Sequence, residues 1–96
     1  MRDSIRARIQ LLTKRQREIV RLVSLGCTDS EAGAIAGLSP NTVNIYRTKS
    51  MQVLGVSKAT ALTRVAIKYG ISPLNDQLSV SERRKVQRKA SRVTGR

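Results

Sequence analysis

The sequence predicts an all-α fold, a bundle of four helices with a basic C-terminal tail. Three observations support this fold class. Apolar residues recur at helical spacing in several segments, short helix-start motifs precede those segments, and glycines stand where they end. A chain of 96 residues provides one small core. We therefore expect one domain at residues 12–71, with an N-terminal extension or linker helix at 1–11 and a tail at 72–96.

The first helix of the bundle is expected at residues 14–25. Thr13 and Gln16 have the spacing of a capping box, in which each side chain accepts a hydrogen bond from the backbone N–H of the other residue. Apolar residues then recur until Gly26, a residue suited to the left-handed position after a helix end. Residues 4–12 show the same helical spacing of apolar side chains, which indicates an additional helix or the remnant of a linker.

Two further helix starts follow at short distance. Thr28 and Glu31 repeat the capping box and open a segment of small residues at 32–36, which a glycine ends. Ser39 then stands as an N-cap before Pro40, which occupies the first helical position, where its missing N–H does no harm. A short helix, a turn containing glycine and a longer helix together have the spacing of a helix-turn-helix motif.

The third helix, at about 40–54, is predicted to have a dry face and a polar face. The dry face consists of Val43, Tyr46, Arg47, Ser50 and Leu54, with Met51 at its edge. The polar face consists of Asn41, Asn44, Ile45, Thr48, Lys49 and Gln52. A merely solvated face more often has pairs of Glu and Lys, whereas amides and hydroxyls match base edges and an isoleucine can pack on a thymine methyl. We therefore expect base contacts from four residues of this face, Asn41, Asn44, Ile45 and Thr48; an ordinary polar surface is the alternative.

A fourth helix is expected from about 58 to 69, between Gly55 and Gly70. One side has an apolar stripe that packs on the core, and another side has an apolar residue among polar ones. The residues of that second side are Thr60, Thr63, Arg64 and Ile67. We expect this side to form a contact between two subunits; the alternative is an ordinary exposed surface, since one exposed apolar residue proves nothing.

The charge of the chain indicates a polyanionic partner. Nineteen Lys and Arg residues stand against six Asp and Glu, a net charge of +13, and residues 82–96 hold seven of the basic residues and one acidic residue. Two Tyr are the only aromatic residues, so there is little to stack on unpaired bases, and duplex DNA is favoured. A capping box at Ser79 and Glu82 precedes the basic run, but the apolar stripe after it is thin. We expect a disordered or conditionally helical tail that contacts DNA, a partner or only solvent.

Composition leaves few residues for catalysis or metal binding. The chain has no His, one Cys and six carboxylates, so we expect no catalytic residue, no metal site and no cofactor. The single cysteine, Cys27, is interpreted as a small structural residue rather than a redox sensor. No apolar run approaches the roughly 18 residues of a membrane span, and the amino terminus lacks an apolar signal segment. We therefore expect a cytoplasmic protein that does not bind membranes.

One set of residues, spread along 12–71, forms a further pattern: Leu12-Thr13, Arg15, Glu18, Leu22, Gly26, Glu31, Ser39, Thr42-Val43, Arg47, Met51, Leu54-Gly55-Val56, Leu62, Ala66 and Gly70-Ile71. With these residues at this spacing, residues 12–71 resemble the LuxR/FixJ/GerE type of helix-turn-helix domain, the output module of NarL-like response regulators. The resemblance implies a four-helix bacterial domain with its third helix in the major groove, its fourth helix as the dimer contact, and DNA sites arranged as pairs of half-sites.

The resemblance also implies site residues. The family's base-contacting positions fall on Asn44, Ile45 and Thr48, and its phosphate-contacting helix starts fall on Thr28, Ser39 and Thr42. We expect further phosphate contacts from three basic residues, Arg15, Arg47 and Lys49.

The chain departs from the family pattern at several positions. The family usually has Lys at the position of Asn44 and His at that of Tyr46, so its base preference does not transfer; Asn pairs more readily with adenine than with guanine. The family's Ile-Ala pair in the second helix is Ala32-Gly33 here, and its following Leu is Ala36. These smaller residues predict looser packing around the second helix.

The predicted function is a sequence-specific transcription regulator that binds double-stranded DNA at the bacterial nucleoid as a homodimer, with RNA polymerase as a further candidate partner. One alternative is the promoter-recognising module of a sigma factor, which begins with a similar Leu-Thr-x-Arg pattern; the fourth helix after Gly55-Val56 argues against it. Another is an interaction protein that pairs with a larger regulator through the fourth helix. The sequence leaves open whether the chain is complete or part of a larger regulator.

Overall fold

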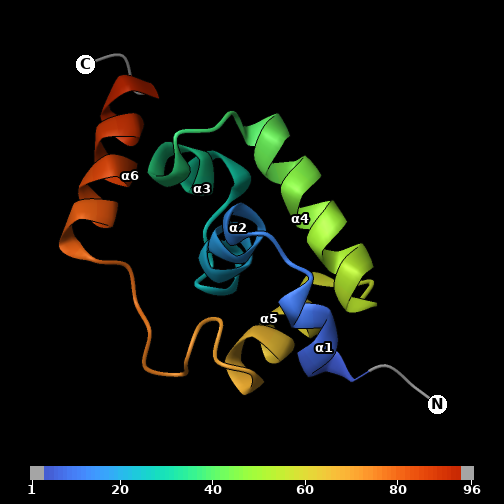
Figure 1. The fold of residues 1–96 in the computed structure, drawn as a ribbon. Coiled ribbons are helices and arrows are strands. Elements are labelled where there is room, and N and C mark those ends of the chain that lie inside the picture. Colours follow the sequence, from blue (N-terminus) through green and yellow to red (C-terminus); the bar gives the residue numbers. More distant parts are fainter. Residues whose placement is uncertain (1–3, 94–96) are drawn as a thin grey trace.

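The computed structural model describes residues 4–93, and its regular elements in that range are all helices (Figure 1). They are α1 (Ile5–Gln10), α2 (Lys14–Ser24), α3 (Asp29–Ala36), α4 (Pro40–Leu54), α5 (Ala59–Lys68) and α6 (Val80–Val93). Helix α2 lies at the centre, where it packs against α3, α4 and α5. Helix α1 packs against α4, and α3 has α4 on one side and α6 on another (Figure 1).

The predicted helix starts are confirmed by their hydrogen bonds. Thr13 accepts the Gln16 N–H at 3.1 Å, and the Gln16 side chain accepts the Thr13 N–H at 2.9 Å. The second capping box joins Thr28 and Glu31 in the same reciprocal way, at 3.1 and 2.8 Å. Ser39 caps α4, with Pro40 at the first helical position. Local side-chain chemistry therefore sets the beginning of the three central helices.

The core consists of two clusters of buried apolar residues. The first joins α1, α2, α4 and α5, and its members are Ile9, Leu12, Val20, Leu54, Leu62 and Ala66. The second joins α2, α3 and α4, and its members are Ile19, Leu22, Ala32, Ile35 and Val43. Val23 of α2 packs against both clusters. Because Ile9 and Leu12 are only 7% and 5% exposed, α1 and the residues after it share the core of the bundle.

Helix α3 packs closely against the turn that follows it. A Cβ atom on Gly33 would lie 2.3 Å from the carbonyl oxygen of Leu38, so the turn occupies the space that any side chain would need. The Leu38 N–H donates to the Gly33 carbonyl at 2.9 Å, and Gly37 between them has a left-handed φ of 74°. The small residues of α3 thus produce a close approach at the turn, rather than the looser packing that the sequence suggested.

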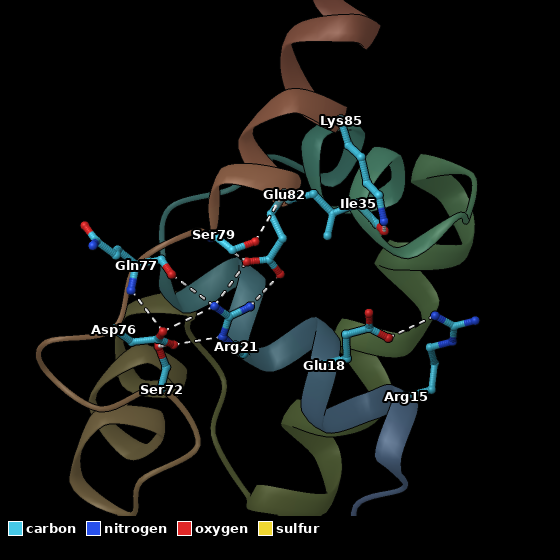
Figure 2. Close-up of polar contacts among 10 residues, drawn as sticks. All are labelled: Arg15, Glu18, Arg21, Ile35, Ser72, Asp76, Gln77, Ser79, Glu82 and Lys85. Carbon is cyan, nitrogen blue, oxygen red and sulfur yellow. Dashed lines mark hydrogen bonds and ion pairs between the residues drawn. The ribbon is translucent and has the colours of Figure 1, made fainter.

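Residues 72–88, called here the C-terminal strap, fold back over the bundle. The sequence predicted a disordered or conditionally helical tail; the structure shows α6 as a helix that packs against α3. Leu78 and Val86 are half-buried against the second core cluster. The Lys85 ammonium donates to the Ile35 carbonyl oxygen of α3 at 3.4 Å (Figure 2). The thin apolar stripe of α6 suffices because α3 supplies a surface on which it packs.

Arg21 of α2 attaches the strap to the bundle through ion pairs (Figure 2). Its Nε donates to Asp76 Oδ2 at 2.8 Å, and its Nη1 donates to Glu82 Oε2 at 2.8 Å. The guanidinium also donates to the Gln77 carbonyl at 3.1 Å, and the Ser72 hydroxyl donates to Asp76 at 2.9 Å. Exposure of the three charged side chains is only 19 to 26%. The hydrogen bonds from Arg21 hold the pKa of Asp76 and that of Glu82 below their ordinary values.

We expect Gly33→Ala to lower the free energy of unfolding by about 2 kcal/mol, because the clash with the Leu38 carbonyl outweighs the higher helix propensity of alanine. Gly37→Ala is the control, because its added Cβ atom would meet open space. It should lower the free energy of unfolding by about 1 kcal/mol, since alanine is disfavoured in the left-handed conformation. Urea denaturation of both variants measures these losses. A Gly33→Ala variant as stable as the unchanged chain would show that the turn does not approach α3 this closely.

Acid should weaken the fold through the Arg21 cluster. The carboxyl groups of Asp76 and Glu82 have a lowered pKa, so they bind protons less readily in the folded than in the unfolded chain. Their contribution to the free energy of unfolding is therefore complete near neutral pH and is lost as the pH falls below about 4. Glu82→Gln should cost about 1 to 2 kcal/mol at pH 7 and make the acid-induced loss shallower. Urea denaturation at pH values from 7 to 3 provides the measurement.

Glu18→Gln is the matched control for Glu82→Gln. Glu18 pairs with Arg15 at 2.9 Å, but both side chains are 40% exposed or more, so its loss should cost less than about 0.5 kcal/mol. Equal effects of the two substitutions on stability and on its pH dependence would refute a special role for the Arg21 cluster.

Candidate nucleic-acid interface

The four predicted base-contacting residues lie on one exposed side of α4. Asn41, Asn44, Ile45 and Thr48 follow one another at intervals of three, one and three residues, which places them along one helical stripe. All four are exposed, and the Ile45 side chain is 46% exposed. Lys49 and Gln52 continue the exposed surface toward the end of the helix. The polar face expected from the helical wheel is therefore present and open to solvent.

Buried residues on the opposite side fix the rotation of α4 about its axis. Val43, Ser50 and Leu54 have no exposed surface. The Ser50 hydroxyl donates to the Tyr46 carbonyl at 2.8 Å, which allows this polar side chain to be buried without an unpaired group. Turning the helix would expose two core apolar residues, so the outward stripe keeps its direction.

Arg47, like Arg15, is a predicted phosphate contact that forms an ion pair within the chain. Its Nη1 forms an ion pair with Asp29 Oδ1 in the first turn of α3, and both side chains are about one quarter exposed. Arg47 thus connects the two helices of the motif, and part of its guanidinium is engaged within the chain. Sequence reasoning missed this pairing; the signal was Asp29, the acidic residue in the first turn of α3 that the capping box at Thr28 and Glu31 does not use.

The hydroxyl groups of Thr28, Ser39 and Thr42 lie at the starts of α3 and α4. Thr28 and Ser39 use oxygen lone pairs to cap their helices, at 3.1 Å in each case. The Ser39 hydroxyl also donates to the Thr42 hydroxyl oxygen at 2.9 Å, so the Thr42 hydrogen is directed to another acceptor. Helix starts of this kind favour anions, because they combine hydroxyl donors with the positive end of the helix dipole.

Two basic side chains approach the end of α3, next to the turn into α4. Arg15 donates to the Ala36 carbonyl at 3.0 Å and to Glu18 at 2.9 Å. Lys85 of the strap reaches the neighbouring carbonyl, that of Ile35. Their positive charges stabilise the negative end of the α3 dipole. The end of α3 thus has one basic side chain from α2 and one from α6 beside it.

The predicted subunit contact lies on α5. Thr60, Arg64 and Ile67 are exposed, and the Thr63 hydroxyl donates to the Ala59 carbonyl at 3.1 Å. A shallow, mainly apolar hollow lies beside three of the four predicted residues. Its lining residues are Val23, Ala59, Thr60, Thr63 and Arg64. Ile67, which is 37% exposed, lies outside the lining of this hollow.

Residues 4–93 contain one cysteine and five acidic residues. Within that range no three His, Cys, Asp or Glu residues gather as metal ligands. Cys27 is half-buried, and burial raises the pKa of its thiol, which favours the unreactive protonated form. None of the helices described combines the length and apolar character needed to cross a bilayer.

Comparison with known proteins gives a family and several relatives. The family described as "Bacterial regulatory proteins, luxR family" matches residues 10–66. The chain is 42% identical to the transcriptional regulatory protein UhpA of Escherichia coli over 53 residues, 55% of the chain and 27% of UhpA. It is 30% identical to the transcriptional regulatory protein FixJ of Rhizobium meliloti over 71 residues, 74% of the chain and 35% of FixJ.

The similarity to FixJ extends to a second organism. The transcriptional regulatory protein FixJ of Azorhizobium caulinodans is 28% identical over 75 residues, 78% of the chain and 36% of that protein. The chain thus spans between a quarter and two fifths of the length of these relatives. No solved structure matched the chain.

The ion pair between Arg47 and Asp29 predicts a difference between two cations of α4. Arg47→Met should lower the free energy of unfolding by about 1 to 2 kcal/mol, because it leaves the Asp29 carboxylate without its partner. Lys49→Met, at an exposed position, should change it by less than about 0.5 kcal/mol. Guanidinium denaturation of both variants tests this. The interpretation fails if the two substitutions have the same effect.

Proposed function

The chain belongs to the luxR family of bacterial regulatory proteins, and we propose that it regulates transcription by binding specific sites on duplex DNA. The observation that supports this most is the exposed stripe of α4, which presents two amides, a hydroxyl and an isoleucine on a helix held rigidly by the core. The relatives UhpA and FixJ are both transcriptional regulatory proteins.

We propose that α4 lies in the major groove. A groove about 12 Å wide admits an α-helix, and each base pair presents a distinct set of donors and acceptors there. The Asn44 amide can donate to N7 and accept from N6 of adenine, with Asn41 and Thr48 as neighbouring hydrogen-bonding groups. Ile45 provides an apolar contact for a thymine methyl. The net charge of +13 favours such an encounter with a polyanion.

Phosphate contacts on both sides of the groove would hold the helix in place. We assign them to the helix starts at Thr28, Ser39 and Thr42, together with Arg15 and Lys49. Arg47 is assigned the same role with a restriction: a guanidinium has five N–H donors, and those that remain after pairing with Asp29 are available to a phosphate.

We also propose that two copies bind DNA together through α5. Thr60, Thr63 and Arg64 adjoin a mainly apolar hollow, and Ile67 adds an exposed apolar side chain on the same helix. A two-fold dimer would place two α4 helices on two half-sites. The protein would act at the bacterial nucleoid, in the cytoplasm, where RNA polymerase is a further candidate partner.

The direct test starts with selection of bound duplexes from a random pool, followed by titration of the selected and of a random duplex. Asn44→Ala should weaken binding to the selected duplex by about 1 to 3 kcal/mol and leave binding to the random duplex nearly unchanged. The loss should concentrate on sites with adenine at one position, because the amide pairs with that base.

Gln52→Ala is the matched control, an exposed amide on the same helix outside the proposed base-contacting set. It should leave both titrations unchanged. Equal losses on selected and random duplexes would remove Asn44 from the base-contacting group. A chain that enriches no duplex, but captures a larger regulator, would replace the proposal with that of an interaction protein.

A further inference from the structure

The C-terminal strap adds a basic helix, α6, to the proposed DNA-binding unit. The family match ends at residue 66, whereas α6 covers Val80–Val93. Four basic residues of α6 up to residue 88 are exposed: Arg83, Arg84, Lys85 and Arg88. Glu82, the acidic residue of α6, is engaged by Arg21 of α2. The outer surface of this part of α6 is therefore positively charged and lacks acidic side chains of its own.

Helix α6 is fixed to the motif rather than tethered loosely. Arg21 holds its first turn, Val86 packs against the core cluster around α3, and Lys85 reaches the carbonyl of Ile35. Figure 1 shows α6 continuing past α3 toward the end of the molecule where the turn into α4 lies. The proposed phosphate contacts at the start of α4 are at this same end.

The charge pattern of α6 is unfavourable for an isolated solvated helix. Arg84 and Arg88 stand four residues apart, so their like charges lie next to each other on one face. In a solvated helix, glutamates at such spacings would usually relieve this repulsion. A row of phosphates would relieve the repulsion as well. Binding would also be favoured by the release of the counterions that the basic groups displace from DNA.

We propose that α6 binds the phosphate backbone of duplex DNA outside the half-site that α4 contacts, and so lengthens the footprint on one side. The inference rests on the proposed function, since it needs α4 in the groove to place α6 beside the flanking backbone. Its contribution is to affinity rather than to base preference, because phosphate contacts are independent of sequence.

The test compares two variants that lose the same charge. The first combines Arg83→Gln, Arg84→Gln and Arg88→Gln, and keeps Lys85 because it contacts α3. The control combines Arg6→Gln, Lys58→Gln and Lys68→Gln, which are exposed on α1, before α5 and in α5, at the other end of the bundle (Figure 1). Each is titrated over a range of salt concentrations with a short duplex limited to the selected site and with a long duplex that extends about ten base pairs on either side.

Log affinity falls with log salt, and we expect the steepness of this fall on the long duplex to be smaller by about 2 to 3 in the α6 variant. This corresponds to about 0.9 for each lost phosphate contact. On the short duplex its slope should match that of the unchanged chain, as should the control on both duplexes. Equal slope losses of variant and control, or an equal loss on short and long duplexes, would overturn the proposal.

Folding and the proposed function are checked separately. Helical content and thermal stability should not fall in the α6 variant, because its three side chains are exposed and their loss removes the repulsion between Arg84 and Arg88. If the variant fails to fold, the pair Arg84→Gln and Arg88→Gln replaces it, with an expected slope loss of about 2. If the unchanged chain binds neither duplex, the proposed function and this inference both fall. If it binds both duplexes and the α6 variants match it, only this inference falls.

Discussion

The position of α4 depends on the burial of its inner side, and the rest of the structure serves to maintain that burial. Val43 and Leu54 are completely buried in different core clusters, near opposite ends of the helix. A helix held at both ends can neither turn nor tilt without exposing apolar surface, at about 25 cal/mol for each Å². The helix backbone that carries Asn44 and Thr48 is fixed for this reason, so the helix itself needs no ordering on binding.

The short helix α3 contacts both α4 and the turn that leads into it. Gly33 lets the turn lie directly against α3, and the pair of Arg47 with Asp29 connects α3 to α4 across the motif. On its other side α3 is covered by α6, whose attachment depends on Arg21. Helix α3, with its small residues, thus packs against α6 in addition to α2 and α4. The strap and the motif form one packed unit, so a change in the strap is felt at α3.

Much of the fold could be predicted because its signals are local. The capping boxes at Thr13 and Thr28 join residues three apart, and the inward and outward sides of α4 follow from helical periodicity. The order of α6 could not be predicted, because it depends on Arg21 and Glu82, which are 61 residues apart. The pairing of Arg47 was missed for the same reason, since its partner lies on another helix. Exposure of the proposed base contacts is observed; their contact with bases remains a proposal.

The central claim is that α4 meets DNA through its exposed stripe, and NMR spectroscopy of the side-chain amides tests it most directly. The account predicts that titration with the selected duplex shifts the NH₂ signals of Asn41 and Asn44 and slows their exchange with water, while the NH₂ signal of Gln10 in α1 stays unchanged. Unchanged Asn41 and Asn44 signals in a complex of full occupancy would contradict it, because the interface would then lie on another face of the bundle.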